Sequence, residues 1–143
     1  MQKLFFLTLL FSFFFSIEVN AKENFFEDAK KNYDNNKMED SKFLFQRNIV
    51  FNPKDAKSYL YLAKIYNFEE NENEEFKNLK TTLLLEPGNE EALYMLIEME
   101  LKKSNFSKVK ELRKKFKIIC SSFCSKVKDI NESLKNIEAK NES

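Results

Sequence analysis

Apolar residues recur along most of the chain at intervals of three and four, the spacing that places side chains on one face of an α-helix. Tyr59, Leu62, Ala63 and Tyr66 follow this spacing in one predicted helix, which begins near Asp55. Only one Gly and two Pro occur among 143 residues, so tight turns and strand hairpins have few places to form. We therefore predict an all-α protein.

The same pattern returns further along the chain. Asn52-Pro53 comes before the helix above, and Glu86-Pro87 comes before the next copy, so the period is 87 − 53 = 34 residues. A fixed period of this length is typical of stacked helical hairpins. The repeated face is apolar at three of its four positions, which are Leu93, Leu96, Ile97 and Glu100.

Four further apolar stripes predict the remaining helices of three hairpins. An acidic linker at 69–73 precedes one of them, and a turn at Ser104-Asn105 precedes another. In chain order the stripes are Phe25, Phe26, Ala29 and Tyr33; Met38, Phe45 and Ile49; Phe76, Leu79 and Leu83; and Phe106, Val109, Leu112, Phe116 and Ile119.

The C-terminal segment carries an apolar seam with charged residues opposite it. We predict a capping helix over 121–139, which covers the exposed core of the last hairpin, and a frayed tail at 140–143. The same seam would also suit a partner helix or a second copy of this chain. The seam consists of Phe123, Val127, Ile130, Leu134 and Ile137.

These residues resemble the tetratricopeptide repeat (TPR) family. That family's pattern has a large residue, Leu, a small residue and Tyr at the spacing of residues 59, 62, 63 and 66, with Pro closing the second helix, as Pro87 does here. The resemblance implies a TPR-like α-α superhelix with three copies at 22–53, 54–87 and 88–120. A helical bundle without repeats is the alternative.

The resemblance is incomplete at two positions of each copy. The family's small residue early in the second helix is replaced by Ser41, Glu75 and Val109. Its turn glycine is replaced by Asn36, Glu70 and Ser104.

In TPR proteins the first helix of each hairpin lines a groove that receives a peptide or helix. The resemblance therefore implies a binding groove for a segment of another protein, without the Lys and Asn arrangement that clamps a C-terminal carboxylate in some members. Each side chain implied at this groove could also be ordinary surface. The implied groove residues are Phe26, Lys30, Lys57, Leu60, Lys64, Asn67, Glu91, Tyr94 and Glu98.

The N-terminal segment has the features of a cleaved signal peptide. A positive start at Lys3 is followed by an apolar run over 4–17 and by Ala21 at the expected cleavage site. The run is shorter than the roughly 20 residues of a membrane-spanning helix. We predict a signal peptide at 1–21 and a periplasmic mature protein. The alternative is an uncleaved segment that anchors the protein in the inner membrane.

Export would place Cys120 and Cys124 in an oxidising compartment, where thiols pair readily. Residues four apart in one helix are poorly oriented for a disulfide, so we predict a break at Ser121-Ser122 and a local bridge. A redox-active pair is the alternative, although the spacing is not CxxC. With no His in the chain, we expect no zinc site and no other metal or cofactor.

Charge is distributed unevenly although the net charge is only +1. Residues 69–100 hold ten acidic and two basic side chains, and residues 102–128 hold ten basic and one acidic. The basic stretch could attract an anionic partner or be a solvated helix face. Export and the lack of a base-stacking motif argue against nucleic acid.

No sequence motif for catalysis is present, since His, a phosphate-binding loop and a Gly-x-Ser-x-Gly turn are all missing. We therefore predict a non-enzymatic adaptor that binds another protein and assists envelope assembly. The alternative is an accessory subunit of a thiol-redox or cytochrome-maturation system that uses Cys120 and Cys124. Homo-oligomers are possible but not favoured.

Overall fold

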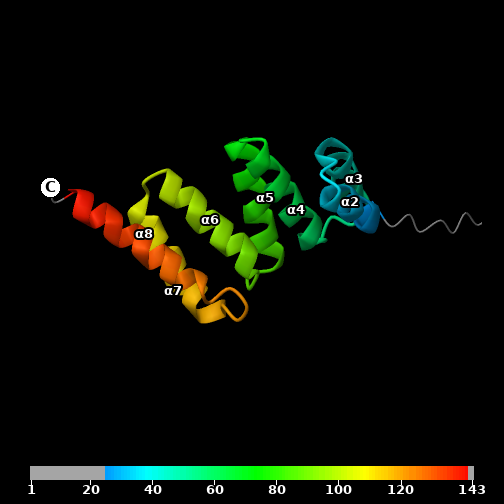
Figure 1. Cartoon of the computed structure of the whole chain (residues 1–143). Helices are drawn as coiled ribbons and strands as arrows, with labels where there is room; N and C mark the ends of the chain where they lie inside the picture. The colour runs from blue at the N-terminus through cyan, green and yellow to red at the C-terminus, as the bar shows by residue number, and fades with distance from the viewer. Residues whose placement is uncertain (1–24, 142–143) are drawn as a thin grey trace, which may run out of the picture.

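The computed structural model describes residues 25–141, which fold as α-helices joined by short turns (Figure 1). No strand occurs in this range, so the all-α prediction is confirmed. The predicted signal peptide at 1–21 lies outside the described residues. The helices are α2 (Phe25–Asp34), α3 (Met38–Phe51), α4 (Ala56–Phe68), α5 (Glu72–Leu85), α6 (Glu90–Lys102), α7 (Phe106–Ile119) and α8 (Lys126–Asn141).

The helices pair into three hairpins, α2 with α3, α4 with α5, and α6 with α7. Successive hairpins stack because α3 packs against α4 and α5 packs against α6, and α8 follows beside α6 and α7 (Figure 1). The predicted boundaries at Pro53 and Pro87 fall in the turns between hairpins. The pattern of three predicted hairpins is confirmed.

The turn inside each hairpin repeats the same backbone geometry. Asn36, Glu70 and Ser104, which are 34 residues apart, have φ angles of 59°, 57° and 56°. This left-handed conformation favours glycine, yet none of the three is glycine. The residue after each one donates its N–H to a carbonyl five residues back, as in a Schellman turn. These bonds are Lys37 to Asn32 (2.9 Å), Asn71 to Tyr66 (2.9 Å) and Asn105 to Glu100 (2.9 Å).

The buried positions also follow the 34-residue period. Leu62, Leu96 and Ile130 are each at most 7% exposed and lie in α4, α6 and α8 respectively. Thus α8 buries the residue that a first helix of a further hairpin would bury. Because of this equivalence, α8 packs against the third hairpin in the way that α4 and α6 each pack against the hairpin before them.

Two groups of side chains make up the core of the described residues. The N-terminal cluster is rich in aromatic side chains and surrounds Phe45, whose ring stacks on Tyr61 at 4.9 Å between centroids. The C-terminal cluster extends from α4 to α8, is mainly aliphatic, and surrounds Leu96 and Phe116. Because side chains of α4 contribute to both clusters, this helix joins the two halves of the stack.

The three residues that replace the family's small residue are all buried, each in a different way. Ser41 satisfies its hydroxyl by donating to the Ala29 carbonyl at 2.9 Å. Val109 is fully buried among apolar side chains. Glu75 is 4% exposed, and its carboxylate accepts a hydrogen bond from Asn67 Nδ2 at 3.0 Å. Burial raises the pKa of the Glu75 carboxyl, because the charged form loses its hydration.

The capping helix differs from the prediction at both ends. It begins at Lys126 rather than 121, because residues 121–125 form the turn closed by the two cysteines. It continues to Asn141, into the segment that we expected to be frayed. The seam itself is confirmed for Ile130 and Leu134, which are buried, and for Phe123 and Val127, which pack against the C-terminal cluster. The side chain of Ile137 lies outside the described part of the chain.

Candidate functional site

The nine residues implied as a groove lie on α2, α4 and α6, the first helices of the three hairpins. We call the surface that they occupy the first-helix face. The structure can show how these side chains are connected to one another and how much of each remains available to a partner.

A series of contacts crosses all three first helices. The ring of Phe26 on α2 lies 5.9 Å from the ring of Tyr61 on α4, in an edge-on arrangement. The Lys64 ammonium lies 4.7 Å from the centroid of the Tyr61 ring, a cation–π distance. The same ammonium pairs with Glu91 of α6 at 2.7 Å. The first-helix face is therefore one connected surface with mixed aromatic and charged character.

Tyr61 is the residue of this face that the sequence analysis missed. We assigned the groove position to Leu60, but the structure places Leu60 in the C-terminal cluster with 7% exposure. Tyr61 is half-buried and contacts Phe26, Tyr33 and Phe45. The sequence offered one signal, since an aromatic residue directly follows a core leucine and so projects to a neighbouring side of the same helix.

Two of the polar groove candidates already bind neighbouring side chains of the protein itself. Lys30 pairs with Asp34 one turn later at 2.6 Å, and this hydrogen bond raises the pKa of the Lys30 ammonium. Asn67 donates to the buried Glu75 of the neighbouring helix. These two side chains therefore serve the fold as well as the surface. Lys57 on α4 and Glu98 on α6 are exposed.

Tyr94 connects the first-helix face to the C-terminal helices. Its ring lies 6.0 Å from the ring of Phe116 on α7, and the Lys126 ammonium of α8 lies 5.2 Å from its centroid. Burial, followed by the hydrogen bond between its hydroxyl and Glu98, raises the pKa of Tyr94. The hydroxyl therefore acts as a hydrogen-bond donor to the Glu98 carboxylate.

A hollow of about 570 Å³ opens beside this face, between α4, the α5–α6 turn and the cysteine turn. Leu60 and Glu91 are the two groove candidates that line it, together with Glu86, Glu90 and Phe123. The Glu90 carboxylate accepts hydrogen bonds from Ser121 Oγ at 2.6 Å and from the Phe123 N–H at 2.8 Å. These bonds lower the pKa of Glu90 to about 2, so the hollow is bordered by negative charge.

The sulfur atoms of Cys120 and Cys124 are bonded to each other in the structure, across the turn between α7 and α8. The chain leaves the helix at Cys120, which is the C-cap of α7, so the pair does not lie within one helix. Ser121 lies inside this turn and donates its hydroxyl to the Glu90 carboxylate. The turn is thus fixed to the first residue of α6.

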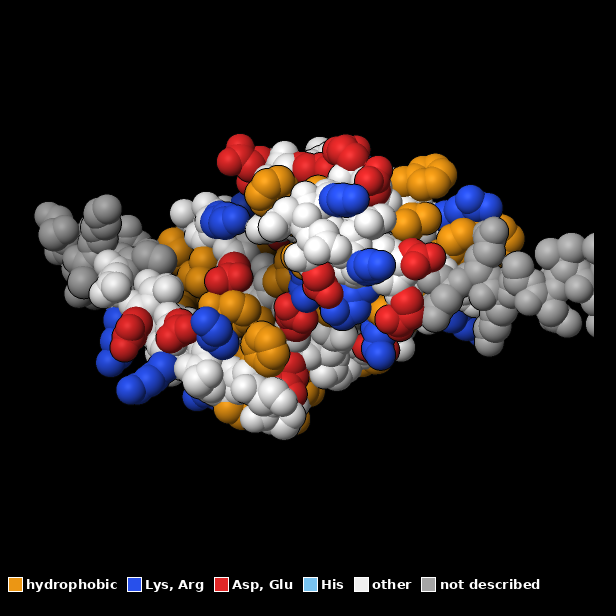
Figure 2. Space-filling view, turned by 45° about the vertical axis from the view of Figure 1, so that its right-hand side comes forward, with side chains coloured by type: hydrophobic (Ala, Val, Ile, Leu, Met, Phe, Trp, Pro, Cys, Tyr) orange, Lys and Arg blue, Asp and Glu red, His pale blue; other side chains and the backbone are white. Residues whose placement is uncertain are grey.

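Within residues 25–141, no cluster of three or more His, Cys, Asp or Glu residues is arranged to hold a metal ion. In the same range no helix has the length and apolar character needed to span a membrane. Figure 2 shows carboxylate side chains along the upper edge of the molecule in that view, and lysine and carboxylate side chains interspersed over its centre. The uneven charge of the sequence therefore gives a surface with both signs.

No family model matches this sequence, and no curated protein matches it either. Among solved structures, the type III secretion translocator chaperone SycD of Yersinia enterocolitica has a similar fold, with a TM-score of 0.72 and 16% sequence identity over 85% of this chain and 86% of SycD. SycD in complex with a peptide of the translocator YopD gives a TM-score of 0.72 and 16% identity over 88% of this chain and 98% of that chain. The described chain therefore has the TPR-like all-helical fold that the sequence predicted.

Proposed function

We propose that this protein is a non-catalytic adaptor that binds a segment of another protein along the first-helix face. The observation that carries the proposal is the connected series formed by Phe26, Tyr61, Lys64 and Glu91, which spans the first helices of all three hairpins. A surface that carries both rings and charges suits an extended peptide, because it offers apolar anchor points beside side chains that supply ionic contacts.

The structural comparison supports the same kind of partner. SycD is a secretion chaperone, and one of its structures holds a peptide of the translocator YopD. A shared fold does not transfer a partner by itself, so the proposal depends on the residues of this face. The peptide would be an extended or helical segment, recognised by the aromatic side chains and by the Lys64–Glu91 pair.

We further propose that the protein acts outside the cytoplasm, in the periplasm, and assists the assembly of an envelope complex. The apolar run at 4–17 and Ala21 support export, and the bonded pair Cys120–Cys124 is suited to an oxidising compartment. An N-terminal sequence of the protein isolated from an envelope fraction tests this proposal. A chain that starts at Lys22 supports cleavage, and an intact start at Met1 contradicts it.

Site-specific crosslinking tests the binding face. A photoreactive amino acid replaces Lys57 or Glu98, which are exposed on α4 and α6, and the protein is irradiated in its own cells. The matched control carries the same group in place of Val50, which is 75% exposed on α3. Mass spectrometry then identifies the captured protein and the captured segment.

The expected result is one shared partner at Lys57 and Glu98 that is not captured at Val50. Substitution of Tyr61 by Ala should reduce this crosslink by about tenfold, because an aromatic anchor at the centre of an interface contributes most of the binding energy. Equal capture at all three positions, or an unchanged crosslink in the Tyr61→Ala variant, would contradict the proposed face.

A further inference from the structure

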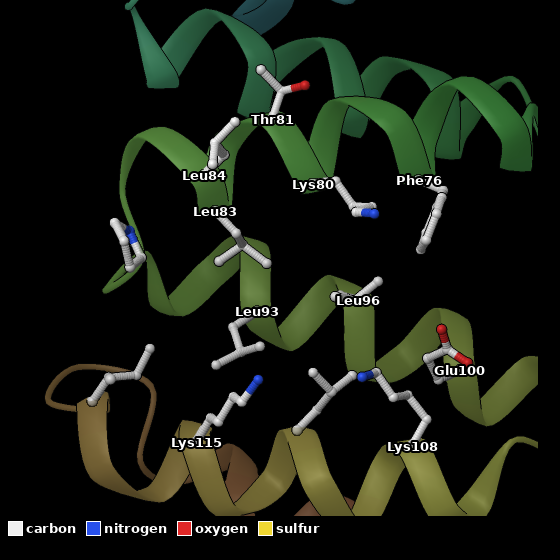
Figure 3. A pocket seen from close by; sticks show the side chains of 13 residues that line it. Phe76, Lys80, Thr81, Leu83, Leu84, Leu93, Leu96, Glu100, Lys108 and Lys115 are labelled. Carbon is white, nitrogen blue, oxygen red and sulfur yellow. The ribbon is translucent and has the colours of Figure 1, made fainter.

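A second surface, separate from the first-helix face, lies between the second and third hairpins. A groove of about 710 Å³ has α6 as its floor and α5 and α7 as its walls (Figure 3). Leucines cover most of its floor and the adjoining walls. The apolar lining residues are Phe76, Leu83, Leu84, Pro87, Leu93, Leu96, Leu112 and Ile119. We call this surface the α5–α7 groove.

The polar residues of the groove are mostly basic. Lys80, Lys108 and Lys115 line it together with a single carboxylate, Glu100. Figure 3 shows the lysine side chains extending into the groove from both walls. Glu111 lies between Lys108 and Lys115 and pairs with both, at 2.8 and 3.1 Å. The exposed side chains of Lys114 and Lys117 add further positive charge to α7.

One apolar side chain of the groove is freely accessible. Leu84 on α5 is 80% exposed, and the residues 34 positions before and after it, Val50 and Ile118, are 75% and 83% exposed. An exposed aliphatic side chain has no packing role in the hairpin that carries it. Leu84 differs from Val50 because it lies at the rim of an apolar groove.

The groove and the first-helix face lie on different sides of α6. Leu93, Leu96 and Glu100 line the groove, whereas Glu91, Tyr94 and Glu98 belong to the first-helix face. At 3.6 residues per turn these two sets are separated by roughly 150° around the helix axis. A ligand in the groove therefore would not compete with a peptide on the first-helix face.

The groove is not a general feature of the repeat. Subtracting 34 from its lining positions gives Tyr59 and Tyr66 where the groove has Leu93 and Glu100. The same shift gives Asn78 where the groove has Leu112, and Glu74 where it has Lys108. The apolar floor and the basic wall are therefore particular to the junction between the second and third hairpins.

We propose that the α5–α7 groove is a docking site for an acidic amphipathic helix of a partner protein. Leucine-type anchors of that helix would rest against Leu84 and the partly exposed Phe76, Leu83 and Ile119, above the buried floor leucines. Its carboxylates would face Lys80, Lys108 and Lys115. The choice of an acidic partner follows from the charge at the groove, where three lysines face Glu100 and the Glu111 carboxylate that Lys108 and Lys115 share, and Lys114 and Lys117 add positive charge beside them. Fields of one sign over a cleft also accelerate association.

The dimensions of the groove suit a helix of a few turns. Its lining on α7 extends from Lys108 to Ile119, which at 1.5 Å per residue corresponds to roughly 16 Å, or three helical turns. Helix-in-groove binding uses anchors at i, i+3, i+4 and i+7 over a length of this order. The lining residues come from α5, α6 and α7, so an additional helix laid along the groove would contact all three.

The probe for this site is a fluorescein-labelled peptide of about 16 residues, with leucines at i, i+3, i+4 and i+7 and glutamates on both sides of that stripe. A second peptide replaces every glutamate by lysine and keeps the leucines. Fluorescence anisotropy with the mature protein should show at least about tenfold tighter binding of the acidic peptide. This preference should weaken as salt is raised, because the ionic contacts are accessible to solvent.

Two variants with equally exposed sites provide the matched comparison. Leu84→Glu should weaken binding of the acidic peptide by about tenfold, since it places a charge at the rim of the groove. Val50→Glu, at the equivalent position of the first hairpin, should change it less than about twofold. The double variant Lys108→Glu/Lys115→Glu should favour the basic peptide instead. Far-UV circular dichroism confirms that each variant is folded.

Three outcomes would overturn the proposal. The first is equal binding of the two peptides by the wild-type protein. The second is an equal loss of binding in Leu84→Glu and Val50→Glu. The third is binding of phosphatidylglycerol vesicles that Leu84→Glu abolishes, without any binding of the acidic peptide, because the groove would then serve a lipid.

Discussion

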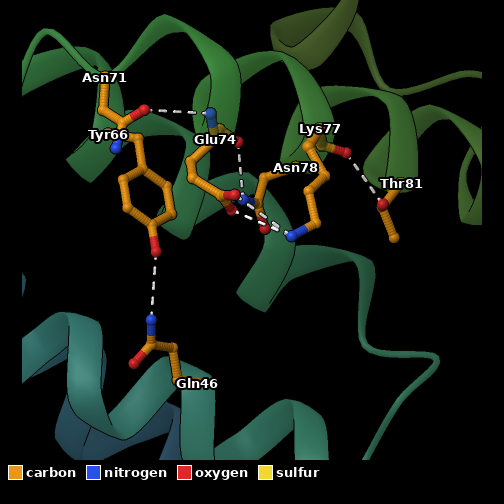
Figure 4. Close-up of polar contacts among 7 residues, drawn as sticks. All are labelled: Gln46, Tyr66, Asn71, Glu74, Lys77, Asn78 and Thr81. Atoms are coloured by element: carbon orange, nitrogen blue, oxygen red, sulfur yellow. Dashed lines mark hydrogen bonds and ion pairs between the residues drawn. The ribbon is translucent and has the colours of Figure 1, made fainter.

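The two junctions between successive hairpins share a backbone arrangement but present different surfaces. At the first junction, polar side chains connect the helices: Gln46 of α3 donates to the Tyr66 hydroxyl of α4 at 3.1 Å (Figure 4), and Lys42 of α3 pairs with Glu69 at 2.7 Å. At the second junction, Lys80 and Glu100 occupy the positions equivalent to Gln46 and Tyr66. They line the α5–α7 groove there, and the polar link across this junction is instead the ion pair of Glu72 on α5 with Lys103 at the end of α6, at 3.4 Å.

This difference shows that the repeat determines where the helices lie and that individual side chains determine what a junction can do. A tyrosine that reaches the neighbouring helix closes the first junction (Figure 4). A glutamate at the same repeat position leaves the second junction open, since its side chain accepts a hydrogen bond from Asn105 Nδ2 at 2.8 Å instead. The first junction is thus linked by a tyrosine contact, whereas the second has the α5–α7 groove at the same repeat position.

The largest expected effect concerns the core below each junction. Phe116→Ala should lower the free energy of unfolding by about 3–5 kcal/mol, because the ring is fully buried and leaves a cavity in the C-terminal cluster. Phe45→Ala should have a similar cost in the N-terminal cluster, where that ring is also fully buried. Urea denaturation followed by circular dichroism measures both values.

Amide hydrogen exchange then shows whether the two halves are separate. In a stack where each hairpin contacts only its neighbours, Phe116→Ala should accelerate exchange in α6, α7 and α8 more than in α2 and α3. A uniform acceleration from α2 to α8 would mean that the described helices unfold as one unit. The two halves of the stack would then not differ in local stability.

The bond between Cys120 and Cys124 stabilises the C-terminal half of the stack, at the turn between α7 and α8. Replacing both residues by Ser should lower the free energy of unfolding by about 2 kcal/mol, the chain-entropy estimate for a loop of about five residues. The contacts of α8 with α7 should weaken most. Urea denaturation of the wild-type protein, with and without a reducing agent, provides the reference.

The same double variant tests the thiol-redox alternative. If the pair is structural, alkylating reagents should not label the native non-reduced protein, and the variant should retain partner binding. Rapid labelling of the wild-type protein, together with loss of function in the variant, would favour redox chemistry over an adaptor.

Transferring the contact of the first junction to the second should close the groove. The double variant Lys80→Gln/Glu100→Tyr places the Gln46–Tyr66 pair 34 residues later, and it should weaken binding of the acidic peptide by about tenfold, or about 1.4 kcal/mol. Anisotropy measures the binding. Glu100→Gln is the control, since it removes the carboxylate without filling the groove, and unchanged binding in the double variant would show that the tyrosine does not occlude the site.

The turns inside the hairpins should respond to glycine in a graded way. Glu70→Gly and Ser104→Gly should each raise the free energy of unfolding by about 1 kcal/mol, because glycine relieves the left-handed conformation at these positions. Asn36→Gly should gain only a few tenths, since asparagine tolerates this conformation. Thermal unfolding measures the series, and destabilisation by Ser104→Gly would show that the φ angle there is not strained.

The smallest expected effect depends on pH. Burial raises the pKa of Glu75, so the folded state binds a proton more tightly than the unfolded state, and stability falls as pH rises above the unfolded pKa of about 4.3. Glu75→Gln keeps an acceptor for Asn67 and removes the charge. It should therefore raise the free energy of unfolding at pH 7 by roughly 1 kcal/mol or less.

This gain should shrink as the pH is lowered towards 5, because wild-type Glu75 then takes up a proton. Glu72, Lys102 and Lys103 are the neighbouring charged groups that modulate the same carboxyl. Glu74→Gln, which removes a partly exposed carboxylate of the same helix, is the control for the substitution itself. A constant difference between pH 5 and pH 7 for Glu75→Gln would contradict the raised pKa.

The sequence predicted the helices well because burial enforces their period. Leu62 and Leu96 have to face the core in each copy, so their spacing appears directly in the chain. The start of α8 was not predictable in the same way. Phe123 continues the apolar seam and packs on the core, but it does so from the cysteine turn rather than from the helix.

The candidate sites were less predictable because they depend on contacts between repeats. Tyr61 was overlooked since an isolated helix does not show that its ring meets Phe26 of the preceding hairpin. The α5–α7 groove was overlooked since Lys108 and Lys115 fit a solvated helix face equally well. A signal was nevertheless present, as Val50, Leu84 and Ile118 place an apolar side chain at one exposed position of every copy.

The three left-handed turns have a consequence for tracing the ancestry of this chain. Asn36, Glu70 and Ser104 share one left-handed backbone conformation, although none of them is the glycine that this conformation favours. Three different sequences in this chain thus form the same pattern of N–H to carbonyl bonds. Distant relatives of this protein should accordingly be easier to recognise by their backbone structure than by their amino-acid sequence.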